Sequence, residues 1–232
     1  AEIDRLERTA RAVKLSQPRP HVVRMEVAER LCAAGREDGF DCRLVYSIFG
    51  SGEVLIDASI RPSPKLPPLP RIGLTMQVPA GFERFSWLGR GPHENYRDRN
   101  VGAAVGRYEA DVDELYVPYI YPQENGNRTD VRWAALRDPC GRGLLAVAVG
   151  GMMEVSALHY TAADLTAARH TNELVRRDEI TLNLDWRQSG LGGHSCGPPT
   201  LEKYLVPPRP VRFSVRLCPT DKDSRCSRPG AR

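Results

Sequence analysis

The sequence lacks the marks of several large classes of protein. It contains no run of about 18 apolar residues, so no transmembrane helix is predicted. Its 33 basic and 29 acidic residues are spread along the chain without a dense Lys/Arg run, so neither a nucleic acid nor a membrane is expected as a partner. No charged-then-apolar leader opens the chain at Ala1, and a cytoplasmic location is therefore expected.

Signatures of metal sites and of a disulfide framework are also missing. The six cysteines, at positions 32, 42, 140, 196, 218 and 226, form no Cys-x-x-Cys pair and no zinc-type spacing with histidine. Because 232 residues can bury a sizeable core without covalent staples, free thiols are expected. A bridge between Cys32 and Cys42 across a hairpin is the alternative. No metal or cofactor is assigned to this chain.

Strand patterns dominate what is present. The 20 glycines and 19 prolines punctuate short apolar segments, a texture typical of a β-sandwich or barrel. Two hairpins are predicted, one joining residues 43–49 to 53–60 through Gly50-Ser51-Gly52, the other joining 131–136 to 144–149. Further strands are expected at 74–78, 82–88, 153–159, 179–186 and 211–217.

Three other segments complete the prediction. The proline-rich residues 62–70 are interpreted as a rigid crossing between sheets rather than a linker or an SH3 ligand. A short helix is expected after Thr161, with Asp164 completing a capping box and with Leu165, Ala168 and Val175 near one face. Residues 219–232 have no apolar pattern and are expected to form a disordered tail.

Three motif-like segments go beyond a generic sandwich. They are FSWLGRGPHENYRDR at 85–99, LYVPYIYPQENGNR at 115–128 and SGLGGHSCGP at 189–198. In this order and spacing they resemble the C-terminal, small-chain domain of bacterial β-galactosidases of glycoside hydrolase family 2. The resemblance covers residues 1–218. The sequence lacks the family's usual opening strand, so an N-terminally incomplete domain is expected.

The resemblance implies an all-β supersandwich of the galactose mutarotase type. Family catalysis is retaining and uses two glutamates on a separate barrel, about 5–5.5 Å apart. No segment of this sequence resembles either glutamate motif, so the chain alone is expected to have no glycosidase activity. The implied role is to support the barrel, complete the rim of the galactoside pocket and contribute to homo-oligomer contacts. Its partner would be the rest of the chain or a large subunit. The Mg²⁺ and Na⁺ that the family often binds would lie mainly on the barrel.

Within the resemblance, the 189–198 loop is the candidate substrate-binding site. His194 and Ser195 can each form hydrogen bonds with sugar hydroxyls. Cys196 aligns with a position at which some family members carry a sugar-stacking tryptophan, and a thiol offers no comparable flat face. A His194–Ser195 catalytic dyad is disfavoured because neighbouring residues on an extended loop point apart. A reactive Cys196 is disfavoured because no cation run lies near it.

The other polar and aromatic residues have plainer interpretations. The carboxylates of Glu94, Asp98, Glu124 and Asp130 are interpreted as salt-bridged loop supports beside Arg97, Arg99 and Arg128. Tyr116, Tyr119 and Tyr121, stiffened by neighbouring prolines, are interpreted as an interdomain packing strap rather than a sugar platform. The rival function is a stand-alone sugar-binding or aldose 1-epimerase-like domain. It would need a histidine, His159 or His170, paired with a carboxylate.

Overall fold

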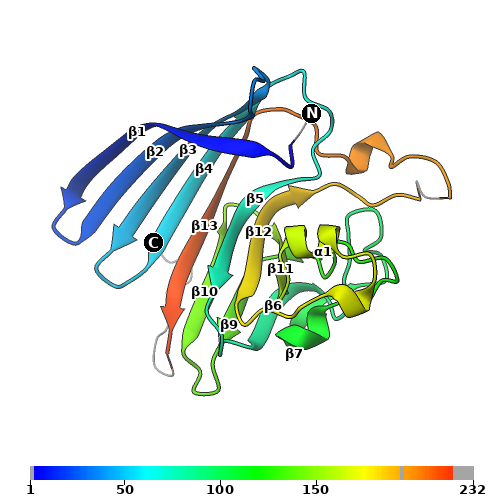
Figure 1. The fold of residues 1–232 in the computed structure, drawn as a ribbon. Coiled ribbons are helices and arrows are strands. Elements are labelled where there is room, and N and C mark those ends of the chain that lie inside the picture. Colours follow the sequence, from blue (N-terminus) through cyan, green and yellow to red (C-terminus); the bar gives the residue numbers. More distant parts are fainter. Residues whose placement is uncertain (1–2, 194–195, 222–232) are drawn as a thin grey trace.

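The computed structural model describes residues 3–193 and 196–221 as two antiparallel sheets (Figure 1). In chain order the strands are β1 (Leu6–Arg19), β2 (Val22–Ala33), β3 (Gly39–Phe49), β4 (Val54–Pro62), β5 (Arg71–Val78), β6 (Arg84–Gly91), β7 (Ala104–Asp111), β8 (Arg128–Val131), β9 (Trp133–Arg137), β10 (Gly143–Val149), β11 (Met153–Leu158), β12 (Ile180–Gln188) and β13 (Val211–Thr220). The nine-stranded sheet has the order β1-β2-β3-β4-β13-β10-β9-β6-β7, and the four-stranded sheet has the order β5-β12-β11-β8. This is the predicted all-β supersandwich.

The main core lies between the four-stranded sheet and strands β13, β10, β9 and β6 of the larger sheet. Phe85 and Trp87 of β6 and Val155 of β11 are among its fully buried side chains. Alternate residues of each strand point into this layer, which is why apolar residues recur at every second position. Within the described residues, no helix is long and apolar enough to cross a membrane.

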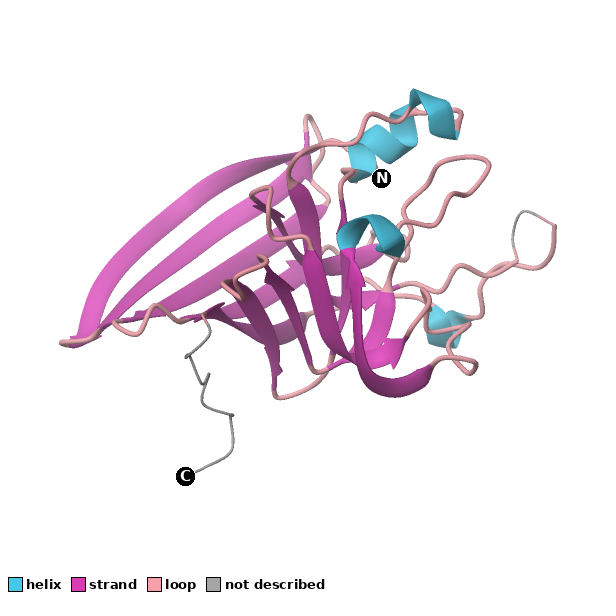
Figure 2. Cartoon of the chain, turned by 90° about the horizontal axis from the view of Figure 1, so that it is seen from below, coloured by secondary structure: helices cyan, strands magenta, loops and turns pink. Residues whose placement is uncertain are grey.

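Strands β1 to β4 extend past the smaller sheet as a curved wing (Figures 1 and 2). Near one end of the wing, Phe40 and Cys42 pack with Leu69 and Ile72 in a second core. Farther out the same face of the sheet is uncovered, and Leu15 of β1 is 73% exposed. The wing therefore has a buried end and an open apolar end.

The structure confirms both predicted hairpins, except that the second begins at Trp133, because Val131 belongs to β8 of the smaller sheet. Strands β3 and β4 pair from Ile48↔Val54 to Phe40↔Pro62, and β9 pairs with β10 across a turn in which the Gly141 amide donates to the Asp138 carbonyl. The proline-rich segment also has its predicted role, because it links β4 of one sheet to β5 of the other. The described cysteines are free thiols, and Cys226 lies outside the described residues.

The helix α1 (Ala162–Ala167) is confirmed, with the Thr161 side chain accepting from the Asp164 amide and the Asp164 side chain accepting from the Thr161 amide. The prediction that Val175 lies on the same helix face as Leu165 is wrong. Val175 is 80% exposed, because α1 ends at Ala167 and a 3₁₀ turn follows. Strand β13 continues to Thr220, beyond the predicted end of the domain at residue 218, and the end of the predicted tail, 222–232, lies outside the described residues.

Candidate functional site

The 189–198 loop leaves the sandwich at the end of β12, and its first residues are held firmly. The Ser189 amide donates to the Pro70 carbonyl at 2.8 Å, and the Ser189 hydroxyl donates to the Leu69 carbonyl at 2.8 Å. The Gly190 amide donates to the Tyr204 carbonyl at 2.8 Å. These bonds fix the exit of the loop to both neighbouring segments of backbone.

Asp98 anchors the loop from the other side. Its Oδ2 accepts a hydrogen bond from the Gly192 amide at 2.7 Å. A Cβ at Gly190 would lie 2.6 Å from the Asp98 carboxyl carbon, and a Cβ at Gly192 would lie 2.4 Å from the Thr200 hydroxyl. Gly192 also has a φ of +62°, a conformation that favours glycine. Gly190 and Gly192 are therefore required by close packing against Asp98 and Thr200.

The three residues predicted to bind substrate belong to the outer part of this loop. His194 and Ser195 lie outside the described residues. Cys196 is exposed, and its amide donates to the Gly193 carbonyl at 3.0 Å.

Glu94 joins the first motif segment to the second. One carboxylate oxygen accepts from the Gly126 amide at 2.7 Å, and the other accepts from Arg99 at 2.7 Å and from the Tyr119 hydroxyl. The side chain is largely buried. Burial, followed by the hydrogen bond to Glu94, raises the pKa of Tyr119, so this phenol donates to the carboxylate. Glu94 is thus the predicted salt-bridged support.

The remaining carboxylates of the group have partners that the prediction did not name. Asp130 pairs with Arg90 at 2.6 Å, and Glu124 pairs with Arg71 at 3.3 Å. The predicted role of these two carboxylates as salt-bridged supports is confirmed, but their arginines come from elsewhere in the chain. Asp98 supports the loop through the Gly192 amide rather than through an arginine.

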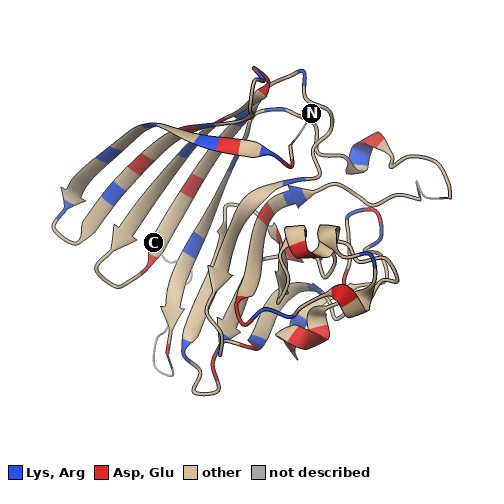
Figure 3. Ribbon diagram, viewed as in Figure 1, with Lys and Arg blue, Asp and Glu red and all other residues tan. Residues whose placement is uncertain are grey.

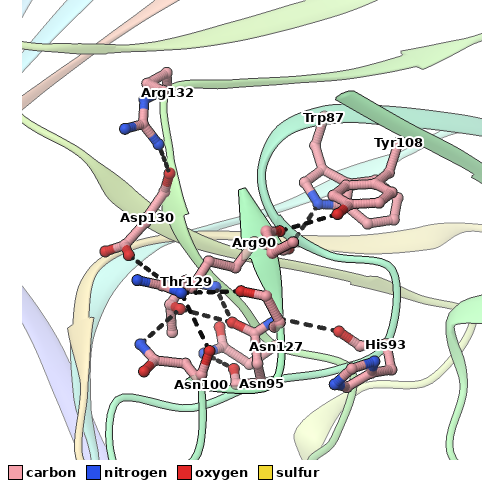
Figure 4. A network of polar contacts seen from close by, with 12 residues as sticks. Trp87, Arg90, His93, Asn95, Asn100, Tyr108, Asn127, Thr129, Asp130 and Arg132 are labelled. Atoms are coloured by element: carbon pink, nitrogen blue, oxygen red, sulfur yellow. Dashed lines mark hydrogen bonds and ion pairs between the residues drawn. The ribbon is translucent and has the colours of Figure 1, made fainter. Parts of the chain in front are cut away.

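A buried amide pair connects the same two motif segments (Figure 4). The Asn95 amide donates to the Asn127 carbonyl at 2.8 Å, and the Asn127 side chain donates back to the Asn95 carbonyl at 3.1 Å. The Asn95 side-chain oxygen accepts from both the amide and the hydroxyl of Thr129. Because buried polar groups need partners, this reciprocal set specifies how the segments fit together.

Trp87 and Arg90 complete this network (Figure 4). The Trp87 indole donates to the Arg90 carbonyl at 2.9 Å, while the Arg90 guanidinium donates to the Ala103 carbonyl at 2.9 Å as well as to Asp130. Asp130 has a φ of 55°, and the Arg90 contact holds its side chain in place. Arg128 lies over the Trp87 ring at 5.1 Å. The two motif segments therefore form one rigid unit, from which Asp98 reaches the 189–198 loop.

The family model of the β-galactosidase small chain matches residues 2–217, which include all three motif segments. The chain belongs to this family. It is 40% identical over 154 residues to a β-galactosidase of Priestia megaterium, and 45% identical over 148 residues to one of Vibrio cholerae. These matches cover 66% and 64% of this chain but only 15% and 14% of the relatives, so the matched part is a small fraction of the curated proteins.

A structural likeness supports the fold. The galactose 1-epimerase of Lactobacillus acidophilus NCFM superposes with a TM-score of 0.51 at 7% identity, covering 93% of this chain and 66% of the epimerase. At this identity the likeness concerns the architecture alone. It agrees with the mutarotase-type supersandwich implied by the sequence resemblance.

In this small-chain domain, both histidines considered for the epimerase-like alternative have a carboxylate partner that the sequence did not reveal: His159 Nε2 lies 2.7 Å from Glu83, and His170 Nδ1 lies 2.9 Å from Glu173. His159 Nε2 also lies 2.8 Å from Arg176, and the residue is only 2% exposed. A sugar cannot reach a nitrogen that is buried and already in contact with two side chains. The His170 pair is exposed and joins residues three positions apart.

Two buried carboxylates lie side by side on the small-chain domain's four-stranded sheet. Glu154 and Asp185 are direct cross-strand partners. Burial raises the pKa of Glu154 to about 7, helped by Asp185, and burial raises the pKa of Asp185 to about 6. Glu154 accepts from Asn127 at 3.0 Å, so this pair lies directly beneath the amide network. The sequence pattern gave no signal of it, because both residues sit inside apolar strands.

The tyrosine strap is only partly buried. Tyr116 packs on Tyr160 with ring centroids 5.1 Å apart, and Tyr119 bonds to Glu94 and Arg99. The tip of the strap is open, because Ile120 is 92% exposed and Tyr121 is 62% exposed. The strap is therefore anchored at two tyrosines and presents an apolar tip.

Proposed function

We propose that this chain is the non-catalytic C-terminal domain of a β-galactosidase, which packs against the catalytic part and places the 189–198 loop at the rim of the galactoside pocket. Membership of the small-chain family supports the first half of this proposal. The hydrogen bond between Asp98 and the Gly192 amide carries the second half, because a loop meant to meet a ligand needs a fixed base.

Exposed apolar side chains support docking against another domain. Ile120 and Tyr121 form the open tip of the strap, while Leu191 in the 189–198 loop and Leu201 after it are also exposed. Burial of these apolar side chains against a partner would remove them from water and lower the free energy. The partner would be the remainder of the β-galactosidase, and the same surfaces could contribute to contacts within a homo-oligomer.

The loop's own chemistry suits a rim rather than a reaction centre. His194 and Ser195 can bond to sugar hydroxyls, and Cys196 supplies a small side chain next to them. Retaining glycoside hydrolysis needs two carboxylates flanking the scissile bond. The catalytic part is proposed to supply both. Within residues 3–193 and 196–221, no three His, Cys, Asp or Glu side chains cluster as a metal site requires, so no step is assigned to Mg²⁺ or Na⁺ here.

The proposal is tested in the complete enzyme that contains this chain. We expect His194→Ala combined with Ser195→Ala to raise KM for a β-galactoside severalfold while the fold and oligomeric state are kept. His21→Ala, at an exposed position in the β1–β2 turn, is the control and should leave KM unchanged. The 232-residue chain alone should not hydrolyse a nitrophenyl β-galactoside above a mock purification. An unchanged KM in the double variant would remove the loop from the pocket, and hydrolysis by the chain alone would refute the non-catalytic role.

A further inference from the structure

The outer face of the nine-stranded sheet carries a basic depression of about 290 Å³, on the side opposite the cores. It crosses strands β1 to β4 and β13. Its lining includes Arg43, Arg61, Arg212 and Ser59, together with the Arg11–Asp41 pair. The flanking residues Cys42 and Leu44 of β3 and Ala58 of β4 are buried, and alternation places the arginines on the other face. Figure 3 shows basic bands interspersed with acidic bands along the strands of this part of the sheet.

The strand register brings the three arginines around one hydroxyl. Arg43 of β3 and Arg212 of β13 are the direct cross-strand neighbours of Ser59 of β4, one on each side. Arg61 lies two residues farther along β4 and therefore on the same face as Ser59. Directly opposed side chains in a sheet lie about 4.5–5.5 Å apart at Cβ, so the side chains of Arg43 and Arg212 begin close to Ser59 on either side.

The acidic residues nearby are already engaged. Asp41, the cross-strand partner of Arg61, accepts from Arg11 at 2.9 Å and pairs with Arg30 at 3.2 Å. Arg43 bonds to Glu26 at 2.5 Å.

Glu29 also borders the depression, but it is next to Ala28 in β2 and its side chain points to the opposite face. There it lies 3.5 Å from Arg8. Within the described part of the chain, no carboxylate lies within 4.0 Å of Arg61 or Arg212. Like charges held close on one face repel, and a bound anion would relieve that repulsion.

We propose that this depression binds a tetrahedral oxyanion of the phosphate or sulfate type. Arg61 and Arg212 would each direct a planar fork of N–H donors at its oxygens, and Ser59 would donate its hydroxyl from below. Arginine suits such oxyanions because its paired donors match the spacing of two oxygens. Arg43 adds positive charge while keeping its bond to Glu26. The site lies on the outer face of the sheet and is separate from the 189–198 loop.

The test uses the 232-residue chain and inorganic phosphate as the probe. Phosphate and sulfate are titrated against chloride at constant ionic strength, with the Ser59 amide chemical shift and the thermal midpoint as readouts. We expect a saturable response to phosphate and to sulfate but not to chloride. Arg61→Gln combined with Arg212→Gln should raise the dissociation constant for phosphate about tenfold or more, because two charge-assisted contacts are lost. Arg36→Gln removes the same kind of charge from an exposed turn after β2 and should leave the response unchanged.

Arg61→Lys combined with Arg212→Lys separates geometry from charge. It keeps both positive charges and the strand contacts, but it loses the paired donors. Intermediate weakening is expected. An equal response from the wild type and the double glutamine variant, or no saturable response in the wild type, would overturn the proposal. If the glutamine variant does not fold, full phosphate affinity in the lysine variant would overturn the role of the arginine forks.

Discussion

Asp98 and Gly192 stand 94 residues apart, and the Gly192 amide donates to the Asp98 carboxylate at 2.7 Å. This bond ties the 189–198 loop to the motif segment 85–99, which is itself joined to 115–128 through Glu94 and the Asn95–Asn127 pair. The three segments that carry the family resemblance are thus one connected structure. Their spacing in the sequence reflects a single assembly whose outermost part is the loop.

Removing the Asp98 anchor should loosen the loop. We expect Asp98→Ala to cost about 1–3 kcal/mol of stability, because the Gly192 amide loses a charged acceptor. Asp98→Asn keeps an oxygen acceptor and should cost less. The comparison is made by denaturant unfolding and by the rate of proteolysis within 189–198. Equal behaviour of the alanine and asparagine variants would show that the carboxylate packs there without anchoring the loop.

Gly192→Ala should be destabilising by about 1 kcal/mol or more, because a side chain is strained at positive φ. A Cβ there would also lie 2.4 Å from the Thr200 hydroxyl. Gly151→Ala is the matched control, since a Cβ at that turn position meets nothing within 4 Å. Chemical unfolding of both variants measures the difference. A Gly192 variant no less stable than the Gly151 variant would contradict the close fit.

Stability should depend on pH through Glu154. Its pKa is raised from 4.5 to about 7 in the folded chain, so the folded state holds a proton that the unfolded state releases between those values. The contribution of Glu154 to the free energy of unfolding is therefore fully present below about pH 4.5 and is lost as the pH rises to 7. The loss amounts to at most about 3 kcal/mol. Glu154→Gln should flatten this decline and be relatively more stable at pH 8. Glu7→Gln, at an exposed position of β1, should follow the wild type. Identical slopes in all three proteins would show that Glu154 does not titrate in this window.

Cys196→Trp in the complete enzyme should tighten binding of an aryl β-galactoside. A flat ring gains about 0.5–1.5 kcal/mol from an aromatic partner beyond the area it buries. Cys196→Leu adds bulk without a π-face and is the control. KM and the inhibition constants of aryl and alkyl galactosides are compared for both variants. If tryptophan and leucine act alike on both ligand types, position 196 offers no stacking contact.

Local patterns predicted the local structure well. The β3–β4 hairpin follows from its β-branched arms and glycine turn, and the start of α1 follows from Thr161 and Asp164. Strands β1 and β2 were not predicted, because arginines and glutamates interrupt their apolar residues. Since β1 is an exposed edge and its apolar side chains are largely uncovered, its sequence carries little of the usual burial pattern.

Long-range pairings could not be read from the sequence. Arginines near Glu124 and Asp130 in the chain suggested neighbours as partners, but Arg71 and Arg90 from other strands pair with them. The Glu83–His159 contact and the Asn95–Asn127 pair join residues 76 and 32 positions apart. Such contacts depend on sheet order, which residue composition does not determine. The sequence indicated the 189–198 loop as a candidate site, but not Asp98 as its anchor.

The position of β13 between β4 and β10 has a consequence for synthesis on the ribosome. The first four strands can form their hairpins early, since each pairs with its neighbour in the chain. They cannot join the rest of the large sheet until β13 emerges, because among the described strands β13 alone pairs with both β4 and β10. A nascent chain stopped before Val211 would hold two sheet fragments with exposed edges, the form most open to aggregation. Synthesis of β13 closes the sheet in one late step of high contact order.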